Sequence, residues 1–154
     1  MSMTSKKMAL LVSFAIAIGV QLVGASLQAQ NEEKYKARLA PVPPLAPIQR
    51  PAVVGIGSAT ATLNGKKLTI TGTFEKLASP ATEAHVNMGQ VTGVRGNAIL
   101  DLTVSKTGTG TSGTIAGSFD LSPDQIDALK KGKLYIQLHS EGVPSGHLMG
   151  WLLK

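Results

Sequence analysis

The stretch TATLNGKKLTITGT, residues 60–73, decides the fold of this chain. Two short runs suited to β-strands, 60–63 and 66–73, flank the dipeptide Asn64-Gly65. Asn-Gly is the strongest short signal for a β-hairpin, because a type I′ turn needs positive φ at both central positions. The stretch therefore predicts two antiparallel strands joined by a tight turn.

Period-two alternation of apolar and polar residues recurs outward from this hairpin. It covers four further runs, and a fifth short run follows a loop of Gly, Thr and Ser: residues 84–89, 98–105, 134–139, 147–152 and 114–119. Such short runs, broken by turn residues, are typical of half-buried strands. We therefore expect an all-β domain, an antiparallel Greek-key-like β-sandwich, over residues 53–154.

One helix is expected between two of these strands, over Ser122–Lys131. Ser122 is a good N-cap, Pro123 suits the first helical position, and Gln125 completes a capping box. Gly132 can adopt the left-handed conformation that ends a helix. The segment is best interpreted as a connector.

The first 29 residues have the pattern of a secretion signal. The basic pair Lys6-Lys7 precedes an uncharged, mostly apolar run, and small and polar residues follow up to Ala29. Cleavage after Ala29 is the favoured interpretation, and an uncleaved membrane anchor is the alternative. Both interpretations place the remainder outside the cytoplasm, in the periplasm or at the cell surface.

Residues 30–52 are polar and then rich in proline, which favours an extended segment that cannot join the interior of a sheet. We interpret them as a Pro-rich linker, either a spacer or an arm lying across a partner. The chain has no cysteine, so its core must supply the stability without disulfides. Its basic residues are scattered and not interleaved with aromatic ones, which argues against nucleic-acid binding.

The arrangement of segments in residues 53–154 resembles the CHRD family, named for the domain repeated in chordin. The matching pieces are spread along the domain: 55–60, 84–86, 113–119, Leu121, Gln125, Leu129, 134–140, 144–146 and Gly150. The resemblance implies a β-sandwich or barrel with extracellular binding or scaffolding roles and no general enzymatic activity. The chain departs from the family at Asn87, usually a second histidine, and at His147 and Met149, usually an acidic residue and an arginine.

No catalytic constellation is evident. Ser140 directly follows His139, so in a strand their side chains point to opposite faces. The carboxylates are scattered, whereas acid–base catalysis needs a positioned pair. A superoxide-dismutase-like site needs more histidines than the three present. We expect no catalytic residues and no enzyme.

Metal binding is the alternative for the histidines. His147 and Met149, two residues apart on a strand, share a face, and imidazole with thioether suits copper. His85 and His139 are the next candidates. The competing interpretation makes the histidines separate polar-face residues, with His85 and His139 hydrogen-bonded to backbone or turn groups, as their places in the family motifs suggest.

Tyr135 and Trp151 also lie on the faces opposite the apolar runs. They form either an exposed strip for a protein partner or part of a strand buried on both sides. The leading hypothesis is a non-catalytic exported binding or scaffolding module with a protein partner. The alternatives are a periplasmic copper-binding protein and an accessory subunit of a membrane complex, which touches the membrane only through an uncleaved N-terminal helix.

Overall fold

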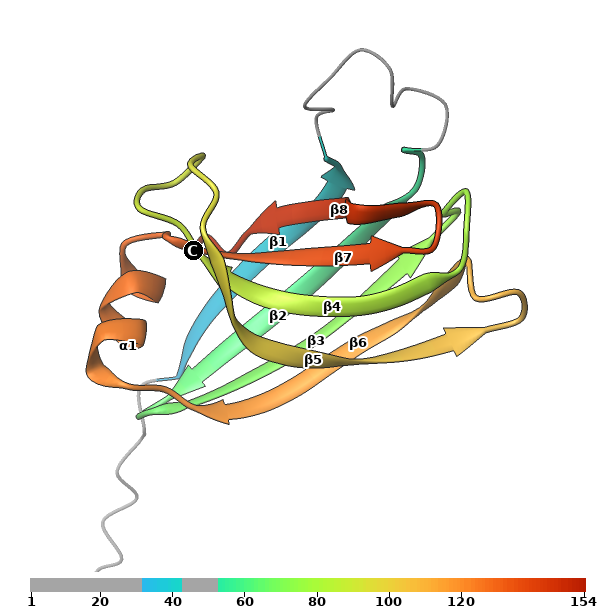
Figure 1. Ribbon diagram of the computed structural model, residues 1–154. Coiled ribbons are helices and arrows are strands. Elements are labelled where there is room, and N and C mark those ends of the chain that lie inside the picture. The colour runs from blue at the N-terminus through green and yellow to red at the C-terminus, as the bar shows by residue number, and fades with distance from the viewer. Residues whose placement is uncertain (1–31, 43–52) are drawn as a thin grey trace, which may run out of the picture.

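The computed structural model describes residues 32–42 and 53–154 and shows eight antiparallel strands closed into a barrel, with one helix (Figure 1). The elements follow in chain order: β1 Glu33–Pro41, β2 Ile56–Asn64, β3 Lys67–Glu75, β4 Ala81–Met88, β5 Asn97–Thr107, β6 Ser112–Asp120, α1 Pro123–Lys130, β7 Leu134–Ser140 and β8 Val143–Trp151. The expected signal segment 1–29 lies outside the described residues. Residues 43–52 of the proline-rich stretch also lie outside them.

The order of strands around the barrel is β1-β2-β3-β6-β5-β4-β7-β8. Strands β4, β5 and β6 are consecutive neighbours, and β7 returns through α1 to pair with β4 on the other side. This order is a Greek key, in which the fourth strand lies beside the first of three hairpin-connected strands. The all-β, antiparallel, Greek-key-like prediction is confirmed, with the strands closed into a barrel where a sandwich was expected.

Closure depends on β1, and the prediction of a linker over residues 30–52 is wrong for Glu33–Pro41. The strand pairs with β2 from Glu33 to Leu39 and with β8 at Ala40 and Pro41. Its inward residues Tyr35, Ala37 and Leu39 are buried, whereas the residues between them are exposed. The period-two pattern was present in the sequence, but the charged residues and the nearby prolines concealed it. The domain therefore includes residues N-terminal to Val53.

The β2–β3 hairpin is present, and its turn lies one residue later than predicted. Asn64 pairs with Lys67, so Gly65 and Lys66 form the two-residue loop. Gly65 has φ of 59°, whereas Lys66 is not among the positive-φ residues. A positive φ at the first central position alone is the pattern of a type II′ turn, which also fits the twist of a hairpin.

Helix α1 lies at one end of the barrel (Figure 1). Ser122 caps it as predicted, and the Ser122 and Gln125 side chains each accept a hydrogen bond from the other residue's backbone N–H. Gly132 has φ of 66°, the left-handed conformation expected after the helix. Ala128 and Leu129 join the buried core, so the connector also closes this end of the barrel.

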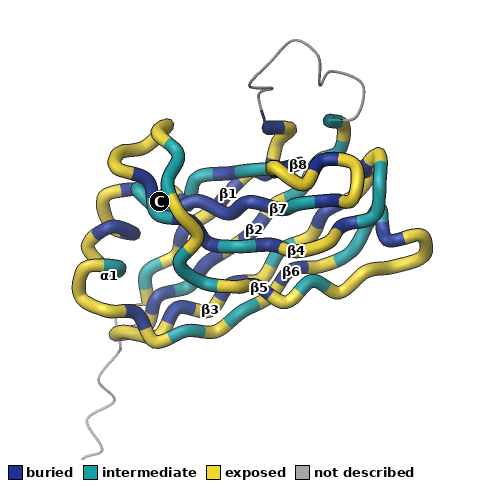
Figure 2. The backbone as a smooth tube through the Cα atoms, in the orientation of Figure 1, coloured by how far each residue is buried: buried dark blue, intermediate teal, exposed yellow. Residues whose placement is uncertain are grey.

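The residues on the outer wall of the barrel differ in solvent exposure from strand to strand. Figure 2 shows β7 buried along nearly its whole length, whereas large parts of β5 and β6 are exposed. Along β7 only His139 is accessible to an intermediate degree. In the described part of the chain, no helix is long and apolar enough to cross a membrane.

Candidate functional site

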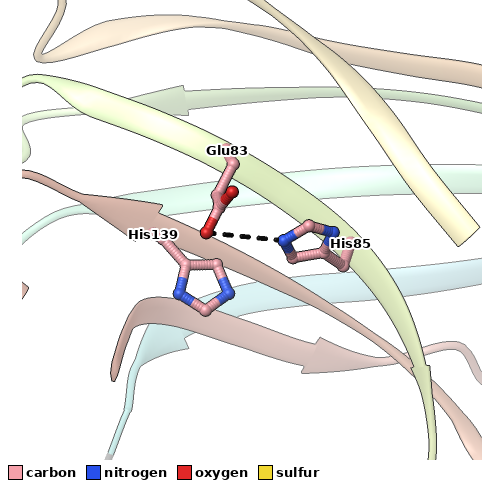
Figure 3. A group of neighbouring side chains, drawn as sticks. All are labelled: Glu83, His85 and His139. Atoms are coloured by element: carbon pink, nitrogen blue, oxygen red, sulfur yellow. Dashed lines mark ion pairs between the residues drawn. The ribbon is translucent and has the colours of Figure 1, made fainter. Parts of the chain in front are cut away.

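The accessible polar cluster on this wall consists of Glu83 and His85 from β4 and His139 from the neighbouring strand β7. Their side chains converge on the outside of the barrel (Figure 3). One ligand atom from each residue lies within 4.8 Å of the other two. Within residues 32–42 and 53–154, this is the one group of three His, Cys, Asp or Glu side chains with metal-binding spacing.

His85 is oriented by a carboxylate on its other neighbouring strand. Its Nδ1 lies 2.9 Å from Oδ1 of Asp101, which is paired with His85 across β4 and β5. A carboxylate can only accept a hydrogen bond, so Nδ1 carries the proton. In the neutral ring, Nε2 therefore keeps its lone pair, and it lies 3.7 Å from Oε1 of Glu83.

His139 is oriented by the backbone. Its Nδ1 lies 2.8 Å from the carbonyl oxygen of Pro144, and this nitrogen must be the donor. Neutral His139 therefore also keeps its lone pair on Nε2. The two imidazoles meet edge to face, with ring centroids 5.3 Å apart.

The cluster presents acceptors to one point on the surface: two imidazole nitrogens and a carboxylate oxygen. These are the ligand types of a two-histidine, one-carboxylate metal site. The sequence pointed to His85 and His139 but missed Glu83 and Asp101. Glu83 precedes His85 by two residues on one face of a strand, a signal that was available, whereas Asp101 required the register of β4 and β5.

His147, which the alternation also predicted to lie opposite the apolar residues of its strand, has a different environment. It is fully buried. Its Nε2 lies 2.6 Å from the carbonyl oxygen of Val54, and its Nδ1 lies 2.6 Å from the hydroxyl of Ser140. Because the carbonyl can only accept, Nε2 donates and Nδ1 accepts, so both nitrogens are engaged. Burial lowers the pKa of His147 below 6.5, which a hydrogen bond to the Val54 backbone only partly offsets.

The predicted copper pair of His147 and Met149 is therefore not assembled. His147 has no lone pair directed at an ion, and Met149 is half-buried between its paired neighbours Gln137 and Ala40. Of the four predicted metal ligands, the structure brings together His85 and His139, and His147 is not part of their cluster.

A serine and a histidine do meet, but the pair is Ser140 and His147. Ser140 also accepts a hydrogen bond of 2.9 Å from Ser79, whose hydroxyl in turn accepts one from the Gly142 backbone. Ser140 and His147 are both completely buried. This chain of hydrogen bonds connects the β7–β8 turn to Ser79, just before β4, and to Val54, just before β2. Its role is structural.

The rings of Tyr135 and Trp151 pack against each other, tilted by 46° with their centroids 4.6 Å apart, and Tyr135 is buried. The Tyr135 hydroxyl donates to the carbonyl of Gly96 and accepts from its N–H, so the loop between β4 and β5 lies over this part of the wall. Trp151 is half-buried. The buried-strand interpretation therefore fits Tyr135 but not Trp151, which is not among the buried core residues.

Asn87 lies under the same loop and is also buried. Its side-chain nitrogen donates to Gly96, whereas its side-chain oxygen is the one buried side-chain polar atom among the described residues without a hydrogen-bond partner. The loop between β4 and β5 therefore buries the position at which the family usually has a second histidine.

The strand order and the outward polar cluster define a Greek-key β-barrel with a histidine-bearing outer wall. The chain belongs to the CHRD domain family, because the family model matches residues 25–152. The matched range includes β1, in agreement with its place in the barrel. No curated protein and no solved structure gives a significant match to the chain.

Proposed function

We propose that this CHRD barrel is an exported, non-catalytic module that binds a protein partner with an acidic surface. The N-terminal pattern of residues 1–29 supports export. The proposal concerns the outer wall of the barrel, since a closed barrel leaves no sheet edge through which a partner can pair.

The observation that carries the proposal is a basic row on β1. Lys34, Lys36 and Arg38 are exposed and alternate with the buried side chains of the strand. Residues two apart on a strand point to the same face at a spacing of about 6.7 Å, so the three charges form a line. Lys34 lies 3.9 Å from the carboxylate of Glu32, but such an exposed pair is weak, so the row stays basic overall and favours a negatively charged surface.

Hydroxyl groups extend this row across the neighbouring strand. Thr62, Thr60 and Ser58 of β2 pair with Lys34, Lys36 and Arg38. Because paired residues of antiparallel strands share a face, the hydroxyls lie beside the charges and can donate or accept hydrogen bonds. A polar surface with charges at one side matches the rim of a non-obligate protein interface.

The burial of the serine–histidine contact described above favours binding over catalysis. Ser140 and His147 are both without solvent exposure, and their hydrogen-bonding groups are engaged with each other and with Ser79 and Val54. A nucleophile must be reachable by its substrate, so this pair supports a structural role.

Crosslinking in the native envelope tests the proposal. The wild-type protein should give a defined adduct with one partner, and the triple variant Lys34→Glu, Lys36→Glu and Arg38→Glu should reduce that adduct at least tenfold. The matched control Lys67→Glu, Lys76→Glu and Lys106→Glu changes the net charge equally at exposed positions away from β1. A wild-type protein without an adduct, or equal loss in both variants, would contradict the proposal.

A further inference from the structure

We propose that Glu83, His85 and His139 bind one divalent transition-metal ion on the outside of the barrel. This inference deepens the proposed binding function by naming a class of ligand. It rests on that proposal for the role of the module as a binding protein. Its site lies on β4 and β7, apart from the basic row on β1. The two can therefore be tested independently.

The first argument is the convergence of acceptors. With Nδ1 of His85 held by Asp101 and Nδ1 of His139 held by Pro144, each neutral ring has one lone-pair nitrogen, Nε2. Glu83 adds a carboxylate 3.7 Å from Nε2 of His85. A carboxylate and lone pairs facing one another gain nothing from mutual contact, whereas a cation between them is stabilised by all three.

The second argument is the distance that closure requires. Zinc binds imidazole nitrogen and carboxylate oxygen at about 2.0–2.2 Å, so tetrahedral ligands lie about 3.3 Å apart. The ligand atoms of the cluster already lie within 4.8 Å of one another. The Glu83 side chain is 61% exposed, so it can rotate toward the ion without disturbing the core.

The third argument is the support behind each imidazole. In metal sites a ligating histidine almost always donates its other N–H to a carboxylate or a backbone carbonyl, which fixes its tautomer and direction. His85 has the carboxylate of Asp101 and His139 has the carbonyl of Pro144. Both rings also stand on paired strands of a closed barrel, which are precise supports for a site.

Two nitrogens and one oxygen select a borderline ion such as Zn²⁺ or Cu²⁺ over Mg²⁺ or Ca²⁺, which prefer oxygen ligands alone. Three protein ligands leave at least one coordination position open toward solvent. A water molecule or a side chain of a partner can occupy it.

Titration of the mature protein with ZnCl₂ by calorimetry tests the site. We expect one Zn²⁺ per chain, and at least tenfold weaker binding in His85→Gln, in His139→Gln and in Glu83→Gln. Asp101→Asn should weaken binding about tenfold through the orientation of His85, because loss of such a supporting partner typically costs 10–100-fold. With Co²⁺ as the probe, the visible absorption of a bound ion should disappear in the same variants.

Glu141→Gln is the matched control for Glu83→Gln, because Glu141 is an exposed carboxylate outside the cluster. It should bind Zn²⁺ as the wild type does. Circular dichroism verifies that each variant is folded. Absence of stoichiometric Zn²⁺ binding, or binding that survives both histidine substitutions, would overturn the site. Neither result would affect the partner adduct of the basic row, so failure of the inference is distinguishable from failure of the proposed function.

Discussion

His139 and His147 lie on neighbouring strands, and the alternation predicts both opposite the apolar residues of their strands, yet they are in contrasting environments. His139 is accessible and keeps one nitrogen for a ligand, next to His85. His147 is completely buried, and both of its nitrogens are used within the protein. The difference lies in the hydrogen-bond partners: Val54, just before β2, bonds to Nε2 of His147 and Ser140 bonds to its Nδ1, whereas His139 bonds to the Pro144 carbonyl through Nδ1.

The comparison teaches that strand alternation assigns a side chain to a face but does not decide its role. An imidazole whose nitrogens both have protein partners contributes to stability, whereas one with a single partner is available to bind. The predictions below test this division, beginning with the largest effect on stability.

His147→Ala should be the most destabilising of the changes considered. It leaves the Ser140 hydroxyl and the Val54 carbonyl without their partner and opens a cavity, which together should lower the free energy of unfolding by about 3 kcal/mol. Urea unfolding followed by circular dichroism measures the loss. A change below about 1 kcal/mol would show that His147 is not the structural histidine.

Ser140→Ala should cost less, about 1–2 kcal/mol, since it removes one buried hydroxyl that links Ser79 to His147. Ser145→Ala, at an exposed position near the start of β8, is the matched control and should unfold as the wild type does. Equal stability of the two variants would exclude the hydrogen-bond chain as a stabilising feature.

The pH dependence of stability should reveal His147 as well. Burial lowers its pKa in the folded state below 6.5, so the unfolded chain binds more protons when the pH is between these values. The contribution of His147 to the free energy of unfolding is therefore complete above pH 6.5 and decreases as the pH falls below it. Urea unfolding at about pH 7.5 and about pH 5.5 should show a larger decrease for the wild type than for His147→Gln. Equal decreases would contradict this assignment.

His139→Ala should have the smallest effect, below about 1 kcal/mol, because the side chain is accessible and water can replace it as the partner of the Pro144 carbonyl. The same urea experiment measures it. A loss as large as that of His147→Ala would remove the contrast between the two histidines.

Much of the fold could be predicted from the sequence, because alternation, the hairpin signal and the capping box are local. The strand β1 was missed although Tyr35, Ala37 and Leu39 alternate correctly, since charges and prolines outweighed a weak pattern. Barrel closure and the register of His85 with Asp101 depend on contacts between distant segments. The candidate site was predicted only in part for the same reason. The histidines are visible in the sequence, whereas the contacts of His147 with Val54 and of Asn87 with Gly96 arise only on folding.

The division between binding and structural histidines can be tested directly by ¹⁵N NMR of the imidazole nitrogens, because the chain contains three histidines. On addition of one equivalent of ZnCl₂, the Nε2 signals of His85 and His139 should shift to metal-bound values, while both signals of His147 remain unchanged. A shift of His147, or unchanged signals of His85 and His139, would contradict the account.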